Sequence, residues 1–330
     1  MFKKLYNQAS ISLSMQPDGP ILIKAGQAGA DPTRPDMEFV RTLHNGKPTI
    51  YLPGSSLKGV VRAHAERLAR TVQAESLAGK LDADRLACDP LDDDKSCCRQ
   101  WNSEIHDRKK AAGKDQKGVP TEELYRRSCF VCRLFGNTSL ASRLRISDAY
   151  PEAPPDTEER NGVAIDRVFG SVAVGPFNYE VATQGAFAST IEIRNFTIAQ
   201  LGLLALVLRD LACQRIGIGF GKSRGLGRVH VQFESFSVRY PACTLNGNLT
   251  LPGAGRPGTP PNVLPGAGMF EQEGGYGLPK DDQIELEGAG LTTDEWGEPH
   301  LVLTDTAGIT NIWCRAVEVW RREAEKAVRK

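Results

Sequence analysis

The chain has 330 residues, of which 40% are hydrophobic and 25% charged, a composition typical of a globular protein with one large domain or two smaller ones. Its 41 basic residues balance 40 acidic ones, so the bulk charge neither requires nor excludes nucleic acid. The longest apolar run, residues 201–208, is too short to cross a membrane, and residues 1–7 lack the apolar stretch of a signal peptide. We therefore expect a cytoplasmic protein, in which clustered cysteines indicate metal binding instead of disulfides.

The spacing of apolar side chains predicts the first elements of the chain. Residues 9–15 alternate apolar side chains with serines, which is the period-two pattern of a half-buried strand. Residues 20–24 predict a second short strand, and residues 25–35, rich in glycine, alanine and proline, predict a loop. Functional residues favour such loops, so this segment is a candidate for chemistry.

A strand over residues 49–52 leads into the first predicted helix. Apolar residues recur at helical spacing from Leu57 to Leu68, and we expect Ser55 or Ser56 to be the N-cap. Residues 82–123 are polar, charged and bracketed by cysteines. They are expected to form an insertion that cannot build a hydrophobic core by itself.

The rest of the chain continues the alternation of strands and helices. The predicted elements are a strand over residues 143–149, a loop over 151–160, a long β-hairpin over 163–194, a helix over 198–213, a glycine-rich loop over 217–227 and a strand over 228–236. The resulting order β-α-β-β-α-β predicts an α+β protein with a ferredoxin-like or RRM-like domain. Beyond residue 240 we expect irregular structure over residues 252–277, further strands over 281–303 and a charged terminal helix over 311–330.

Residues 53–59 place small residues and Lys58 at the turn from a strand to a helix. Unpaired backbone N–H groups and the helix dipole favour an anion at such a turn, and a phosphate would suit it. An ordinary N-cap with a solvated lysine explains the same residues. Residues 53–59 therefore indicate phosphate binding only in combination with other motifs.

The glycine-rich loop has glycines at positions 217, 219, 221, 225 and 227, together with Lys222 and Arg224. Glycines let a backbone pass close to a ligand, and the two cations are available for phosphates. The loop precedes a strand and does not open a helix, which argues against nicotinamide or flavin binding.

Five cysteines lie in and just after the polar insertion, namely Cys88, Cys97, Cys98, Cys129 and Cys132. Cys129 and Cys132 have the CxxC spacing that lets two thiolates share a tetrahedral zinc ion, and Cys88 with either Cys97 or Cys98 completes four ligands. His106 is an alternative to one of the cysteines. A redox CxxC pair is the rival interpretation, but it leaves the other three cysteines unexplained. Four thiolates leave no position open for water, which indicates a structural site.

Residues 53–59 and 219–227, in this order and with residues 132–137 between them, resemble the signature of the RAMP superfamily. The order is similar to that of the repeated backbone subunit of type III CRISPR effector complexes, over about residues 5–238. The resemblance implies an RRM-like fold that holds guide CRISPR RNA, with complementary target RNA, other RAMP subunits and a large type III subunit as partners. It implies these RNA-binding residues: Ser55, Ser56, Lys58, Arg62, Arg133, Gly219, Gly221, Lys222 and Arg224.

The resemblance also implies a β-hairpin thumb within residues 163–192, although a hairpin that packs on a neighbouring subunit explains the same pattern. In target-cutting members an aspartate lies in the loop before the lysine turn, and Asp36 occupies that place, with Asp31 as a competitor. A free aspartate has a pKa of about 3.9, so Asp36 is expected to hold Mg²⁺ or Mn²⁺ near the scissile phosphate, with attack by the RNA's own 2′-hydroxyl. A solvated loop carboxylate is the alternative.

Some members of this family carry a zinc knuckle at the place of the polar insertion, which agrees with a structural Zn²⁺ held by Cys88, Cys97, Cys129 and Cys132. The chain is then expected to have four segments. They are residues 1–81, the first part of the core with the catalytic loop; residues 82–135, the zinc-binding insertion; residues 136–240, the rest of the core with the thumb and the glycine-rich loop; and residues 241–330, a Gly/Pro-rich C-terminal extension.

Three functions follow from these expectations. The leading one is a guide-binding RAMP subunit that cleaves target RNA as a metal-dependent endoribonuclease through Asp36. The second is a catalytically inert, architectural guide-binding subunit of the same complex. The third is a ribonuclease that processes the guide precursor, for which His44, near Asp36 in the sequence, is the candidate acid or base.

Overall fold

A computed structural model describes residues 3–26, 35–73, 85–92, 96–97, 119–253, 257–271 and 274–329, with the side chains of the last helix described to residue 326. Strand β1 (Gln8–Pro17) lies at the centre of the main sheet. In the described part of the chain this antiparallel sheet is seven-stranded, with the order β14-β15-β9-β1-β8-β4 and with β5 paired to β8. The other strands of the sheet are β4 (Leu144–Ile146), β5 (Tyr150–Pro151), β8 (Phe187–Arg194), β9 (Val229–Arg239), β14 (Thr292–Thr293) and β15 (Pro299–Leu303).

The alternation predicted for residues 9–15 is the pattern of β1. Ile11 is fully buried and pairs with Ile191 of β8 and Phe236 of β9, while the serines on either side of it are half-buried. Apolar side chains on one face of three neighbouring strands thereby join into a single core.

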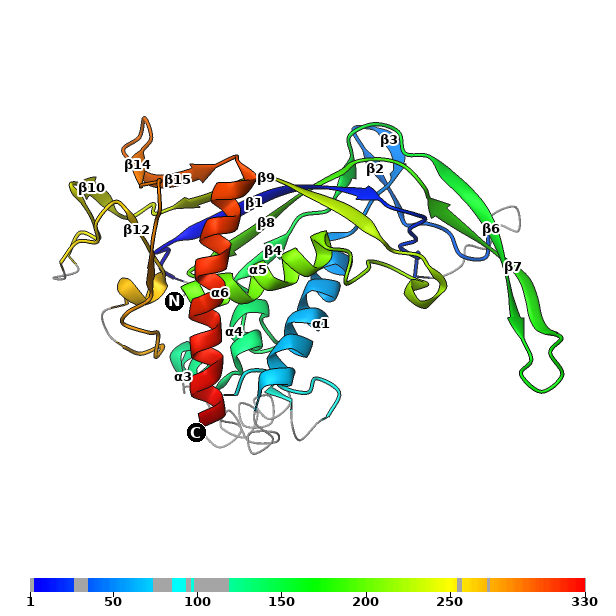
Figure 1. The fold of residues 1–330 in the computed structure, drawn as a ribbon, viewed down its shortest axis with the longest axis horizontal. Coiled ribbons are helices and arrows are strands. Elements are labelled where there is room, and N and C mark those ends of the chain that lie inside the picture. Colours follow the sequence, from blue (N-terminus) through cyan, green and yellow to red (C-terminus); the bar gives the residue numbers. More distant parts are fainter. Residues whose placement is uncertain are drawn as a thin grey trace, which may run out of the picture.

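Helices cover one face of this sheet (Figure 1). They are α1 (Gly54–Val72), α3 (Thr121–Arg127), α4 (Phe130–Phe135), α5 (Ile198–Ala212) and α6 (Thr306–Arg329). Thr197 and Gln200 form a capping box at the start of α5, which is buried along almost its whole length. A Cβ at Gly202 would lie 2.1 Å from the carbonyl oxygen of Ala316, so glycine lets α5 and α6 pack closely.

The elements β1, α1, β4, β8, α5 and β9 follow one another in the order β-α-β-β-α-β, as the sequence predicts. In the described ranges four two-stranded sheets lie outside the main sheet, and the two with the longest strands are hairpins. One consists of β2 (Arg41–His44) and β3 (Lys47–Ile50), and the other of β6 (Thr157–Ile165) and β7 (Val172–Ala182), which projects from the body of the protein (Figure 1). The short elements are β10 (Thr244–Asn246), β11 (Asn248–Thr250), β12 (Val263–Pro265), β13 (Gln283–Glu285), η2 (Lys222–Arg224) and η3 (Ala267–Met269).

Several local predictions are wrong. Residues 20–24 form no strand, because only Ile21 and Lys24 make isolated bridges, to Ala182 and Phe39. Residues 151–160 are not a loop throughout, since β5 ends and β6 begins within them. The long hairpin also differs from its predicted range, because it begins at β6 and because β8 belongs to the main sheet.

The N-cap of α1 is Pro53, and neither Ser55 nor Ser56 takes that position. The carboxylate of Asp148 accepts a hydrogen bond from the backbone N–H of Gly54 at 2.7 Å. A distant acid thus satisfies one of the free N–H groups at the start of the helix, and a local serine cap is not needed.

The C-terminal residues join the same core. β15 pairs with β9, and α6 packs on α5 with a buried face that includes Ile312, Trp313 and Trp320. The helix predicted over residues 311–330 is therefore amphipathic and begins earlier, at Thr306. No helix in the described ranges is long and apolar enough to cross a membrane.

Candidate nucleic-acid interface and metal site

The glycine-rich loop packs tightly against residues 20–22. Gly219 has φ +72°, and a Cβ there would lie 2.2 Å from the carbonyl oxygen of Leu22. The next residue, Phe220, donates its backbone N–H to that same oxygen at 2.7 Å. Only glycine allows both the left-handed conformation and this close approach, so the loop holds η2, with the exposed Lys222 and Arg224, in a fixed place.

The loop and one face of α1 form a cleft of about 560 Å³. From α1 it is lined by Val60, Ala63, His64 and Arg67, which share one helical face, and from the other side by residues that include Arg215, Lys222 and Arg228. Burial, followed by the nearby charge of Arg67, lowers the pKa of Lys222. Four cations against Asp18 among the lining residues make this cleft attractive to an anionic chain.

A buried pair of side chains, His64 and Asp210, lies beside this basic cleft. His64 Nε2 lies 2.8 Å from a carboxylate oxygen of Asp210, whose other oxygen accepts hydrogen bonds from Arg209 and Arg215. Arg67 Nη1 lies 3.4 Å from His64 Nδ1. These contacts orient two of the arginines of the cleft.

Lys58 and Arg62 lie on a different face of α1. The Lys58 ammonium donates to the hydroxyl of Ser142 at 2.8 Å and to the carbonyl of Leu144 at 3.1 Å. Burial, followed by the charge of Arg62, lowers the pKa of Lys58. Arg62 donates to Glu66, to the carbonyl of Gly136 and to the thiol of Cys132. Of the predicted RNA-binding residues on α1, Ser55 is exposed, while Ser56 is half-buried.

The two remaining predicted arginines are placed differently. The guanidinium of Arg133 donates to the carbonyls of Tyr125 and Ser128 and so joins α3 to α4. Arg224 is exposed and lies over the ring of Phe220, at 5.7 Å, and over that of Phe177 on β7, at 6.0 Å. The glycine-rich loop therefore touches the base of the projecting hairpin.

Asp36 also meets this hairpin. Its exposed carboxylate accepts a hydrogen bond from the backbone N–H of Asn178 at 2.9 Å, and Met37 bridges to Tyr179. Asp36 thus lies beside Phe177 and Asn178, next to the contact that Arg224 makes with the hairpin. Asp31, the competing residue, lies outside the described ranges.

The thiols of Cys88, Cys97, Cys129 and Cys132 gather in one buried cluster, in which all ligand atoms lie within 4.8 Å of one another. Cys129 caps α4, and its sulfur accepts the backbone N–H of Cys132. Residues 85–88 are brought alongside, because Phe130 and Val131 donate their N–H groups to the carbonyls of Arg85 and Leu86. Cys98 and His106, the alternative ligands, are not among the described residues.

The cluster fits a tetrahedral zinc ion. Sulfur ligands at about 2.3 Å from Zn²⁺ would stand about 3.8 Å apart, and the sulfurs of Cys88 and Cys132 are 3.7 Å apart. Hydrogen bonds from Cys129 and Cys132 lower the pKa of Cys88, while burial raises that of Cys129. A bound cation would take the four sulfurs as thiolates, with release of their protons. This buried four-cysteine cluster is compatible with structural Zn²⁺.

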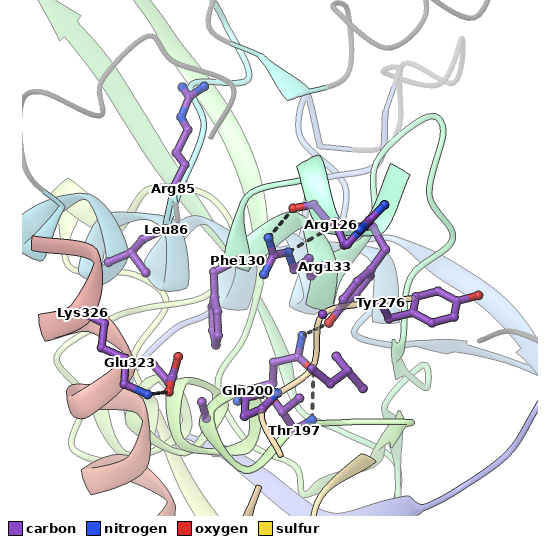
Figure 2. Close-up of a pocket in the computed structure, with 15 residues that line it drawn as sticks. Arg85, Leu86, Arg126, Phe130, Arg133, Thr197, Gln200, Tyr276, Glu323 and Lys326 are labelled. Atoms are coloured by element: carbon purple, nitrogen blue, oxygen red, sulfur yellow. Dashed lines mark hydrogen bonds and ion pairs between the residues drawn. The ribbon is translucent and has the colours of Figure 1, made fainter. Parts of the chain in front are cut away.

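A separate pocket of about 330 Å³ lies where α3, α4, the start of α5 and the end of α6 meet (Figure 2). One of its polar contacts joins segments that are distant in the sequence, and two are local. Gln200 donates to the Tyr125 hydroxyl, Arg133 to the carbonyl of Arg126, and Lys326 pairs with Glu323 (Figure 2). The contact between Gln200 and Tyr125 joins the insertion to α5, while the C-terminal helix α6 is held by its packing on α5.

The sequence analysis predicts Lys58 and Arg62 as RNA-binding residues of α1, but the cleft is lined by the other face of this helix, which carries Arg67. Helical spacing from Val60 was the signal that could have found it, because residues 60, 63, 64 and 67 share one face. Which of the two faces meets the glycine-rich loop depends on packing.

A family model described as the RAMP superfamily matches residues 17–230, which is more than half of the chain. The chain therefore belongs to the RAMP superfamily, a group of CRISPR-associated RNA-binding proteins. A comparison with curated proteins finds no match.

Proposed function

We propose that this chain is a guide-RNA-binding backbone subunit of a type III CRISPR effector complex and that it cleaves complementary target RNA. The observation that carries the proposal is the basic cleft, which is lined by Arg67 of α1, by Lys222 of the glycine-rich loop and by Arg228 just after that loop. Such a surface recognises phosphates without reading bases, so base pairing by the guide would select the target.

The fold supports this proposal. The β-α-β-β-α-β order with an antiparallel sheet is that of a ferredoxin-like or RRM-like domain, and β6 and β7 form a projecting hairpin in the position proposed for a thumb. The cysteine cluster would hold structural Zn²⁺ and close the insertion. Lys58 and Arg62 support the cleft from behind in this proposal, through Ser142 and the cluster.

Asp36 is the proposed catalytic residue. It lies at the base of the hairpin, so a target strand that crosses the hairpin would pass its carboxylate. Asp36 would hold Mg²⁺ or Mn²⁺ together with a phosphate of the target, and this cation would balance charge that develops at the scissile phosphate. The 2′-hydroxyl of the target would be the nucleophile.

A purely architectural role is the second candidate, and one observation favours it. Among the described residues, the cysteine cluster is the only group of three or more His, Cys, Asp or Glu side chains that could hold a metal ion. Asp36 therefore belongs to no such group of three in the described part of the chain. In this case a neighbouring subunit would cut the target.

The test is cleavage of target RNA by the guide-loaded complex in Mg²⁺, with Asp36→Asn compared with wild type. The amide oxygen of asparagine can still accept the N–H of Asn178, so the substitution removes charge and keeps the contact. We expect at least about a 100-fold loss of cleavage with assembly unchanged. The control is Glu295→Gln, an exposed carboxylate in the β14–β15 turn. Undiminished cleavage by Asp36→Asn would contradict a catalytic role for Asp36 and would favour the architectural role of this chain.

A further inference from the structure

Three aromatic rings are stacked beside the β2–β3 hairpin. The rings of His44 and Tyr150 are parallel within 11°, with centroids 3.9 Å apart. Tyr150 also stacks with Tyr51, at 5.8 Å and 16°. Tyr150 is the ring that both pairs share, so His44 stands at one end of the stack. None of these rings belongs to the hydrophobic core.

The His44 end of the stack lines a second cleft, also of about 560 Å³. One wall consists of the β2–β3 hairpin, with His44, Lys47 and Pro48, and the other of the proline-rich residues 151–155. Lys47 is exposed and makes no ion pair within the described ranges, whereas Arg41, at the edge, is paired with Glu180. The cleft thus offers a flat ring and an available cation at adjacent places.

A tight turn and strand pairing position the stacked rings in the absence of a ligand. Asn45 and Gly46 have φ values of +51° and +74°, which is the conformation of a tight two-residue hairpin turn and fixes His44 opposite Lys47. Tyr150 is held by β5, which pairs with β8. A ligand that stacks here would lose little free energy to ordering of the protein.

We propose that this cleft binds one unpaired nucleobase, stacked on the open face of His44, with its phosphate near Lys47. A flat base continues the stack of rings, and base stacking on aromatic side chains with a neighbouring cation is the common way in which proteins hold single-stranded nucleic acid. The site is distinct from the basic cleft, which holds Arg67 and Lys222 and is lined by no Phe, Tyr or Trp among the described residues. The inference rests on the proposed binding of RNA and adds a site for one unpaired nucleotide.

The nucleotide could come from the guide strand or from the target strand. The experiment uses the complex that copurifies with this chain. In the first arm it is reconstituted with guides that carry a photoactivatable base at successive positions. In the second arm the guide is unlabelled and the targets carry the photoactivatable base. Crosslinked peptides are identified by mass spectrometry. We expect one position to crosslink to the hairpin at residues 44–47. The arm in which this crosslink occurs identifies whether the bound nucleotide belongs to the guide or to the target.

His44→Ala should lower this crosslink about fivefold or more, because stacking on the ring is lost, while His44→Phe should retain it. His230→Ala, at an exposed histidine on β9, is the matched control, and thermal unfolding of each variant checks folding. Crosslinks confined to the basic cleft, with none at residues 44–47 in either arm, would overturn the site and leave RNA binding intact. Absence of crosslinks from the whole chain would overturn both proposals.

Discussion

The guanidinium of Arg62 donates a hydrogen bond to the thiol of Cys132, with 3.6 Å between Nη2 and Sγ. This contact joins α1 to the cysteine cluster, and Arg70 adds a second link through the carbonyl of Cys88. The helix that lines the basic cleft is therefore supported by the insertion.

Substitution of Arg62 by methionine should weaken zinc binding. Groups that hydrogen-bond to metal ligands typically contribute 10- to 100-fold to metal affinity, so we expect a loss of about that size for Arg62→Met. Competition with a zinc chelator measures it. Arg67→Met, on the opposite face of α1, should leave zinc affinity unchanged. Equal effects of both variants would contradict a role for the hydrogen bond from Arg62 to Cys132 in holding the metal.

Removal of one ligand should release the metal and destabilise the fold. Because residues 85–88 and α4 are held together at the cluster, Cys129→Ser should lose zinc and lower the free energy of unfolding by several kcal/mol, on the order expected for a structural site. Metal analysis and denaturant unfolding measure the two effects. Cys213→Ser is the control, since Cys213 is exposed. A chelator should destabilise wild type and not Cys129→Ser.

Substitution of two glycines in the glycine-rich loop distinguishes the cost of a left-handed backbone conformation from the cost of a steric collision. Gly219 and Gly225 have φ values of +72° and +83°, but only at Gly219 would a Cβ collide with backbone, at Leu22. Gly225→Ala should cost about 1–2 kcal/mol of stability from its conformation. Gly219→Ala should cost clearly more and should also weaken RNA binding, because η2 would be displaced. Equal losses in urea unfolding would show that the loop does not pack on residues 20–22.

The salt dependence of RNA binding tests the basic cleft. If Arg67 and Lys222 each contact a phosphate, alanine at either position should reduce the slope of log affinity against log salt concentration by about 0.7. Both residues line the cleft, whereas Arg322 is exposed on α6 and serves as the control. Binding is measured with guide RNA over a range of salt concentrations. An unchanged slope in the double variant would place the guide elsewhere.

Asp282 should make stability depend on pH. Its carboxylate accepts the N–H groups of Ile198 and Gly268, and burial raises its pKa to about 7 from the ordinary 3.8. Between those values the folded state binds a proton that the unfolded state lacks. The contribution of Asp282 to stability is therefore present at low pH and is lost as pH rises to 7, by at most about 1.4 kcal/mol per pH unit.

Asp282→Asn removes this titration. The free energy of unfolding of wild type, minus that of the variant, should therefore fall as pH rises from 5.5 to 7.5. Denaturant unfolding at each pH measures it. A constant difference over that range would mean that Asp282 stays ionised when folded, held by its two backbone donors.

Much of the fold follows from local pattern. The alternation around Ile11 predicts β1, helical spacing predicts α1, a long apolar run predicts α5, and the order of elements predicts the α+β class. The CxxC spacing of Cys129 and Cys132 predicts two ligands of one cluster. These features depend on neighbours within a few residues, so the sequence carries them directly.

Other features depend on contacts between distant residues. The cap of α1 is supplied by Asp148, and no local pattern shows that an acid 94 residues later would meet Gly54. Likewise Asp36 and Asn178 are 142 residues apart.

By itself the sequence determined which residues share a strand face or a helix face, because those periods are fixed by backbone geometry. Tertiary structure alone decided which face of α1 meets the glycine-rich loop. Contacts with Leu144 and with the cysteine cluster hold Lys58 and Arg62, and Arg67 is left to line the cleft, since packing of the whole core sets the rotation of a helix.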